Sequence, residues 1–192
     1  MKLNLNFYFV TIFGIAFAYV LYASYQYDNI FRYFLFVVFG LTMLYFFYGN
    51  LFDTAGNYKS KKILINDSTF IVGFIIILIN SGIFCFYELK LHSQTFLKAN
   101  NHGLYADFKK NGQYIISSGS WASKTHFYGN YKLIDSIIIL DKSYFDEVLY
   151  SKKLRIHAVK ETGESKLLLF QVDSKEQITG KYSFEITEYN RK

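Results

Sequence analysis

The feature that most constrains the fold is an apolar stretch from Ser68 to Glu88, which reads STFIVGFIIILINSGIFCFYE. It carries no charge before its last residue and contains no proline. An α-helix rises about 1.5 Å per residue, so a helix of this length crosses a hydrocarbon core about 30 Å thick. No comparable stretch follows it in the chain. We therefore expect residues 1–90 to form a transmembrane anchor and residues 91–192 to form a soluble domain.

Two more apolar runs precede this one, at Asn6–Ser24 and Phe31–Tyr48. The sequence therefore predicts three membrane spans, at about 6–24, 31–48 and 68–88. The connector between the first two is so short that they should form an antiparallel hairpin. A signal peptide is the competing interpretation of the first run, because Leu21 and Ala23 fit the small or apolar positions before a cleavage site. The length of the run and the second span that follows it favour an uncleaved helix.

Three residues of these spans are candidates for helix packing. Gly14 and Ala18 are small residues four positions apart, a spacing that lets two membrane helices approach closely. Asn80 is a polar amide near the middle of the third span, so it should face the other helices. Small residues are also common in membrane helices without such a contact, and an amide in a span can alternatively line a ligand or ion pathway. The same contacts offer a route to a homo-oligomer.

The positive charges that flank the spans predict the orientation, because lysine and arginine are enriched on the cytoplasmic side. Four such charges lie on one side and three on the other: Lys2, Lys59, Lys61 and Lys62 against Arg32, Lys90 and Lys98. We therefore expect the N-terminus in the cytoplasm. Three crossings then place the C-terminal domain outside the cytoplasmic membrane, and removal of the first run as a signal peptide would leave it on the same side.

The second half of the chain has the period of two that is typical of half-buried strands. Leu154, Ile156 and Ala158, for example, alternate with charged or polar neighbours, and Asn111-Gly112 predicts a tight hairpin turn. The segment between Lys142 and Tyr150 suits one or two helical turns. The fold class that we predict is therefore membrane α plus soluble β, with an antiparallel meander curled into a small barrel. The seven strands expected are 105–108, 113–118, 126–133, 136–140, 154–158, 167–172 and 182–187.

The run YADFKKNGQYIISSGSW…FYGNYKLIDSIIIL, within Leu104–Ile156, resembles the small lipocalin-like meander domains of bacterial envelope proteins. In those domains a strand, an Asn-Gly turn, a Gly-x-Tyr strand and an Asp-Ser-Ile-Ile strand follow in order. In true lipocalins a Gly-x-Trp opens the first strand, whereas here Gly119-Ser120-Trp121 comes after two strands. The resemblance therefore implies a meander and carries over no ligand pocket. For the location we expect the bacterial cytoplasmic (inner) membrane.

No catalytic or metal-binding pattern stands out in the sequence. None of the four histidines is paired at i, i+4, and Cys85 is the only cysteine, so no intrachain disulfide forms. Asp135 and Asp141 flank one predicted strand, where they either act as an acid–base pair or simply end the strand pairing. The net charge is +5 from Lys90 onward and +1 before it. This excess suits anionic lipid or an acidic partner and is too diffuse for nucleic acid. We expect no enzyme, metal or cofactor.

One polar segment is the candidate contact site of the soluble domain. Trp121 lies among small residues that include Ser120 and Ser123, and an aromatic side chain in such a loop is a common anchor for a partner. The alternative is that Trp121 closes one end of the barrel.

These features leave two main hypotheses for the function. The first is a membrane-anchored, non-catalytic binding or immunity protein whose β-domain engages an envelope protein or an incoming toxin. The alternative is a ligand-gated membrane effector of bacterial antiviral defence, with a β-barrel sensor for a small anionic signal. A hydrolase or transferase is a third and weaker hypothesis. The side of the membrane that holds the C-terminus distinguishes the first two.

Overall fold

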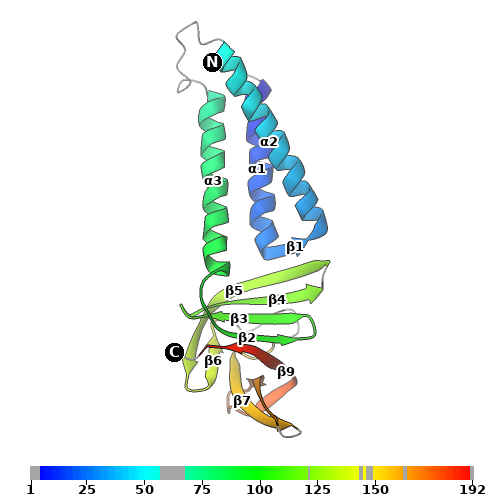
Figure 1. Cartoon of the computed structure of the whole chain (residues 1–192), viewed down its shortest axis with the longest axis vertical. Coiled ribbons are helices and arrows are strands. Elements are labelled where there is room, and N and C mark those ends of the chain that lie inside the picture. Colours follow the sequence, from blue (N-terminus) through cyan, green and yellow to red (C-terminus); the bar gives the residue numbers. More distant parts are fainter. Residues whose placement is uncertain are drawn as a thin grey trace. The chain divides into compact units, whose positions relative to one another are not determined.

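The computed structural model describes residues 5–56, 68–120, 122–142, 145, 149–161 and 164–190. The chain divides into two compact units, Met1–Leu89 and Lys90–Lys192, and the first is helical while the second is built of strands (Figure 1). The elements are α1 Leu5–Gln26, β1 Tyr27–Asn29, α2 Ile30–Gly56, α3 Ser68–Leu91, β2 Thr95–Asn101, β3 Leu104–Lys109, β4 Gln113–Ser120, β5 Ser123–Ile134, β6 Ile137–Leu140, β7 Lys153–Glu161, β8 Glu164–Val172 and β9 Ile178–Tyr189.

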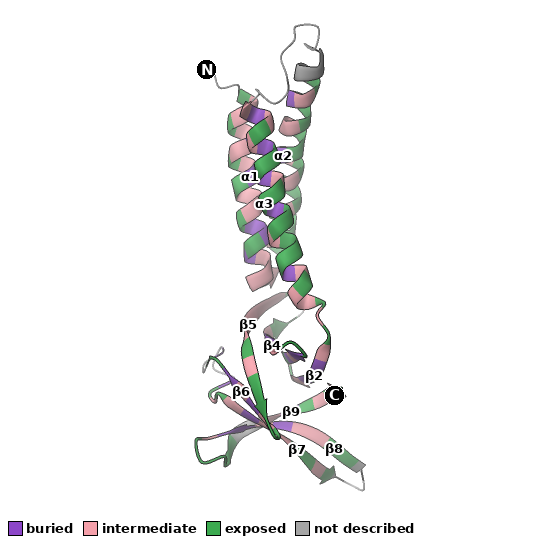
Figure 2. Cartoon of the chain, turned by 90° about the vertical axis from the view of Figure 1, so that its left-hand side faces the viewer, coloured by how far each residue is buried: buried purple, intermediate pink, exposed green. Residues whose placement is uncertain are grey.

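The first unit holds three helices that are long and apolar enough to cross a membrane, which confirms the prediction of three spans. Their outer sides carry exposed residues along most of their length (Figure 2), and many of these are large apolar side chains such as Ile12, Tyr19 and Phe34. Hydrocarbon is a suitable environment for such a surface. α2 continues to Gly56, beyond the predicted end at Tyr48.

Close packing inside the helical unit involves glycine. Val10, Met43 and Ile76, one from each helix, form a small buried cluster. A Cβ atom added at Gly14 would lie 2.7 Å from Cγ2 of Ile76, so a side chain at this position of α1 would force Ile76 of α3 to move. Gly73 has the same relation to the ring of Phe47 in α2, at 2.4 Å.

The second unit contains a closed antiparallel barrel of eight strands, β2 to β9. Each strand pairs with its neighbours in sequence, β9 pairs with β2, and no parallel pairing occurs among them. The predicted meander and its closure into a barrel are confirmed. β2 was missing from the predicted strands, and it is the strand that closes the barrel between β3 and β9.

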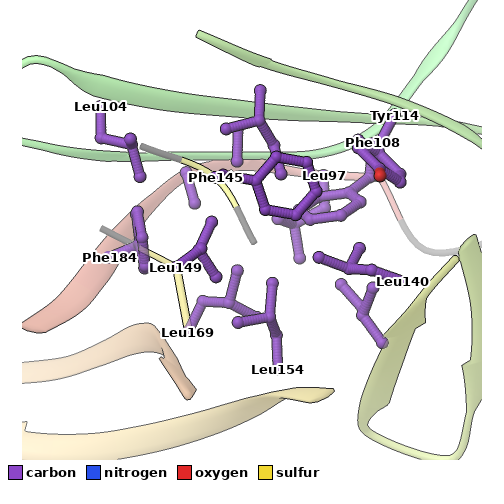
Figure 3. Close-up of a cluster of buried hydrophobic side chains, with 14 of the residues drawn as sticks. Leu97, Leu104, Phe108, Tyr114, Leu140, Phe145, Leu149, Leu154, Leu169 and Phe184 are labelled. Atoms are coloured by element: carbon purple, nitrogen blue, oxygen red, sulfur yellow. The ribbon is translucent and has the colours of Figure 1, made fainter. Parts of the chain in front are cut away.

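Large side chains fill the interior of the barrel over the residues that the structure describes. They come from nearly every strand and converge on one cluster (Figure 3). Phe145 and Leu149 belong to this cluster, at 1% and 0% exposure, and they pair in an isolated antiparallel bridge. Residues 143–144 and 146–148, where helical turns were expected, lie outside the described residues. The other large members of the cluster with less than 2% exposure are Leu97, Phe108, Tyr114, Ile116, Ile138, Leu154, Leu169 and Phe184.

Candidate functional site

The hairpin that was predicted as a contact site ends in the pair Ser120–Ser123, the last pair between β4 and β5. Ser120 is exposed and Ser123 is half-buried. Gly119, with φ of 138°, donates its N–H to the carbonyl oxygen of Gly103 at 3.1 Å, so this hairpin is held against the β2–β3 turn. Trp121 itself lies outside the described residues.

The three predicted packing residues lie at different places in the helical unit. Gly14 contacts Ile76 of α3, and Ala18 is half-buried one turn further along α1. Asn80 is buried in α3, and its Nδ2 donates to the carbonyl oxygen of Ile76 in the preceding turn at 2.8 Å. Its Oδ1 has no hydrogen-bond partner among the described residues.

A buried lysine at the start of the barrel was not predicted from the sequence. Lys109, the last residue of β3, is 3% exposed, and its Nζ donates to the carbonyl oxygen of Leu91 at 2.7 Å. Leu91 is the last residue of α3 and its carbonyl is one of those that a helix end leaves without an intrahelical partner. Nζ also pairs with Oδ2 of Asp107 at 2.8 Å, so the buried charge is compensated.

The chain between α3 and β2 is fixed to the barrel by further bonds. Oδ1 of Asp107 accepts the hydroxyl of Thr95 at 3.0 Å, and the N–H of Lys110 donates to the carbonyl oxygen of Gln94 at 2.8 Å. Only three residues separate α3 from β2, and none of them is glycine or proline. We call this arrangement of Leu91–Thr95 with Asp107, Lys109 and Lys110 the joint.

A pocket of about 510 Å³ opens beside the joint. Such a volume lies within the range of about 300–1,000 Å³ that small-molecule sites occupy. Its walls are largely aromatic and its rim carries one lysine and one aspartate. We call it the mouth pocket, and its main lining residues are Phe96, Lys110, Tyr131, Leu133, Asp135 and Tyr189.

Local geometry places the aromatic walls of the mouth pocket. The register between β2 and β3 shifts between Thr95 and Leu97, and such a bulge re-aims a side chain, here that of Phe96. The rings of Phe96 and Tyr131 are stacked with centroids 6.4 Å apart, and Tyr189 meets Phe96 edge-on at 5.4 Å. The Tyr131 hydroxyl donates to the carbonyl oxygen of Lys109 at 2.8 Å. Burial, together with the nearby charge of Asp107, raises the pKa of Tyr131 to about 12, so the hydroxyl keeps its proton.

The two acidic residues that flank β6 lie in different environments. Asp135 is at the rim of the mouth pocket, with φ of 53°. Asp141 accepts the Tyr114 hydroxyl at 2.8 Å and the N–H of Asn130 at 2.9 Å. Partial burial opposes ionisation of Asp141, but these hydrogen bonds and the charge of Lys142 outweigh it and hold its pKa below the usual value. These separate roles give no support to an acid–base pair.

The described residues contain no group of three or more His, Cys, Asp or Glu side chains that could hold a metal ion. Comparisons of the chain with protein-family models, with curated proteins and with solved structures found no match. What the fold defines is a class: a membrane protein with three spanning helices and a closed eight-stranded antiparallel barrel. The mouth pocket and the joint are the features of that barrel that bear on its function.

Proposed function

We propose that the protein is a membrane receptor whose barrel binds a small molecule in the mouth pocket and passes the response to α3 through the joint. This is the ligand-gated alternative among the sequence hypotheses. The observation that supports it is that pocket and joint share residues. Lys110 lines the pocket, and its N–H holds the carbonyl of Gln94. Tyr131 lines the pocket, and its hydroxyl holds the carbonyl of Lys109, the residue that binds the end of α3.

The pocket walls indicate the chemistry of the ligand. Three aromatic rings favour a molecule with a planar part that can stack. Lys110 and Asp135 at the rim have opposite charges, so the ligand should also carry a polar group with both donors and acceptors. This balanced rim suits a neutral or zwitterionic molecule better than the anionic signal expected from the sequence.

A ligand in this pocket would act on the joint if it made more contacts with one conformation of the joint than with the other. Binding can shift an equilibrium only if the ligand contacts the two states of the joint differently. We expect this difference at Phe96, which lines the pocket and lies two residues after Gln94. Only three residues connect Leu91, the end of α3, to β2, so a change at Phe96 should be passed to the helix end.

The single cysteine of the chain allows a direct test, because Cys85 is exposed on α3, six residues before Leu91. Full-length protein with a nitroxide on Cys85 is placed in lipid nanodiscs, and planar aromatic compounds are screened by thermal shift. A compound that raises Tm should also change the nitroxide spectrum. Tyr189→Ala should abolish both effects, and Tyr105→Ala, which changes an exposed tyrosine outside the mouth pocket, should preserve both. Lys109→Met should keep the thermal shift and lose the spectral change.

Two results would refute the proposed receptor function. If bound compounds leave the Cys85 spectrum unchanged in the unsubstituted protein, the barrel is not coupled to α3. If the thermal shifts survive Tyr189→Ala as well as Tyr105→Ala, the ligands bind elsewhere.

The location remains part of the proposal: the bacterial cytoplasmic membrane, with the barrel outside. The lysine distribution supports this orientation, although Lys59, Lys61 and Lys62 lie outside the described residues. A periplasm-active phosphatase and a cytoplasm-only fluorescent reporter, each fused after Lys192, test it. Phosphatase activity without fluorescence agrees with an extracytoplasmic ligand, and the reverse result places the ligand in the cytosol.

A binding or immunity role toward an envelope protein or toxin is the second candidate. The exposure of Ser120 favours it, because the Gly119–Gly103 hydrogen bond fixes the end of β4 on which Ser120 lies. Co-purification of a partner should be lost in Trp121→Ala. An unchanged complex would exclude this residue as the anchor.

A further inference from the structure

We propose that a second pocket of the barrel, beside the end of α3, binds the phosphate of an anionic phospholipid headgroup. This pocket is separate from the mouth pocket and has a volume of about 220 Å³. We call it the side pocket. It is smaller than the range of about 300–1,000 Å³ for drug-sized ligands, and it suits a headgroup phosphate rather than a whole lipid.

Two lysine ammonium groups gather at one residue of the side pocket. Nζ of Lys142 donates to the backbone carbonyl of Tyr128 at 2.7 Å, and Nζ of Lys90 lies 5.7 Å from the centre of the Tyr128 ring. Both lysines line the pocket. An ammonium group has three donors, so the bond of Lys142 to the Tyr128 carbonyl leaves donors for a phosphate oxygen.

The one carboxylate of the side pocket is already engaged on both oxygens. Oδ1 of Asp141 accepts the Tyr114 hydroxyl and Oδ2 accepts the N–H of Asn130. Asp141 is bonded to these two neutral donors and interacts with the charge of Lys142, and the two lysines of the pocket exceed it by one positive charge. An anion is favoured over a neutral ligand at this position.

The position of Lys90 in the chain sets the depth of the side pocket in the membrane. Lys90 lies two residues after Glu88, the end of the apolar stretch, and in the last turn of α3. At about 1.5 Å per residue it lies within about 3 Å of the end of the apolar run. The headgroup layer on each side of the hydrocarbon is about 5–8 Å thick. Lys90 therefore lies at the depth of the lipid phosphates.

The source of the phosphate is a lipid, because the pocket opens where lipid phosphates are concentrated and lysines near the surface attract anionic lipid. An anionic lipid is preferred over a zwitterionic one, since the choline of the latter brings a positive charge to a site with a positive excess. This proposal does not depend on the receptor function, and Tyr189→Ala should leave headgroup binding unchanged.

Native mass spectrometry of the full-length protein in a neutral detergent provides the test. Dioctanoyl phosphatidylglycerol is titrated against dioctanoyl phosphatidylcholine, and the phosphatidylglycerol complex is challenged with inorganic phosphate. We expect phosphatidylglycerol to bind more tightly than phosphatidylcholine and to resist millimolar phosphate. Lys90→Gln and Lys142→Gln should each weaken phosphatidylglycerol about fivefold, the effect of one lysine near an anionic surface.

Two further variants serve as controls in case a substitution disturbs the fold. Lys142→Arg retains the charge and should retain binding. Lys160→Gln removes an exposed charge from β7, outside the side pocket, and should change the affinity less than twofold. Three results would each overturn the proposal. The two lipids could bind equally, Lys142→Gln and Lys160→Gln could lose the same affinity for phosphatidylglycerol, or inorganic phosphate alone could displace the lipid.

Discussion

The helical unit and the barrel place their apolar side chains in opposite ways. Along α1, α2 and α3 the large apolar residues are mostly exposed, with Phe31 and Leu89 each at 75%, and the buried cluster of Val10, Met43 and Ile76 is small. In the barrel the large apolar residues point inward and fill one cluster. The difference shows that the two units are built for different solvents, hydrocarbon for the helices and water for the barrel.

The two units also differ in how fully a buried polar side chain is bonded. Asn80 in α3 is buried with its Oδ1 unpartnered among the described residues, whereas Lys109 in the barrel is bonded to both Asp107 and Leu91. An unpaired buried charge costs far more than an unpaired amide oxygen, so only the lysine needs this full compensation. We therefore expect the stability of the barrel to depend strongly on these two contacts of Lys109.

The largest effect is expected when the compensation of Lys109 is removed. Asp107→Asn leaves a buried ammonium group without its counter-ion, and we expect a loss of about 3–5 kcal/mol in the free energy of unfolding of the barrel. Glu185→Gln, which breaks the exposed and longer contact with Lys166, should cost less than about 1 kcal/mol. Urea unfolding followed by tyrosine fluorescence measures both. Equal losses would show that the burial of Lys109 does not matter for stability.

The opposite placement of apolar residues is tested by a matched pair of leucines. Leu169→Ala creates a cavity at a fully buried position of the barrel and should cost about 2–5 kcal/mol. Leu78→Ala in α3 changes a residue that is 55% exposed, and it should cost much less because no cavity forms. Thermal unfolding in detergent, read separately for strands and helices by circular dichroism, checks the pair. A large loss in Leu78→Ala would indicate that a partner chain covers this face of α3.

Two glycines of the helical unit provide the next comparison. A side chain at Gly14 collides with Ile76, so Gly14→Leu should destabilise the packing of α1 on α3 by about 1–3 kcal/mol. Gly82 in α3 has no atom within 4 Å of its added Cβ, and Gly82→Leu should be tolerated. Helix melting in detergent measures both variants. If Gly82→Leu is the more harmful of the two, an oligomer contact at Gly82 becomes the better explanation.

The fold class was predictable because the two solvents leave different patterns in the sequence. Apolar runs predicted the three helices, and the alternation at Leu154, Ile156 and Ala158 predicted strands. β2 was missed because Phe96 and Leu97 are adjacent apolar residues rather than alternating ones. The bulge between Thr95 and Leu97 turns both side chains inward, and a period of two cannot reveal such a bulge.

The candidate site was much less predictable than the fold. Lys109-Lys110-Asn111-Gly112 has the composition of a solvated hairpin turn, and the burial of Lys109 depends on a tertiary contact with the Leu91 carbonyl. The walls of the mouth pocket come from β2, β5 and β9, far apart in the sequence. Because β2 was missed, the predicted connection between α3 and the barrel was long, and nothing in the sequence indicated the contact between Leu91 and Lys109.

A smaller effect is expected from removing the unpaired amide in α3. Asn80→Leu loses one hydrogen bond to Ile76 and removes the unpartnered Oδ1, so the free energy of unfolding should change by less than about 1 kcal/mol. Ser81→Leu, at the exposed neighbouring position, is the control for added apolar volume. Helix melting and the oligomeric state in detergent are measured together. A loss of oligomer in Asn80→Leu alone would show that Oδ1 bonds to a second chain.

The smallest effect is the acid sensitivity that Asp141 contributes to the barrel. Its pKa in the folded protein lies below the usual value, so its stabilising contribution is complete above the unfolded pKa of about 3.9. The contribution is lost as the pH falls through the folded pKa, because protonation then removes the charge that the Tyr114 hydroxyl and the Asn130 N–H stabilise. Asp141→Asn should therefore be less stable than the unsubstituted protein at pH 6, and the gap should narrow toward pH 3. Tyr114→Phe keeps only one of the two bonds and should show an intermediate acid response in urea unfolding at each pH, whereas a gap that stays constant with pH would mean that Asp141 stabilises the barrel without its charge.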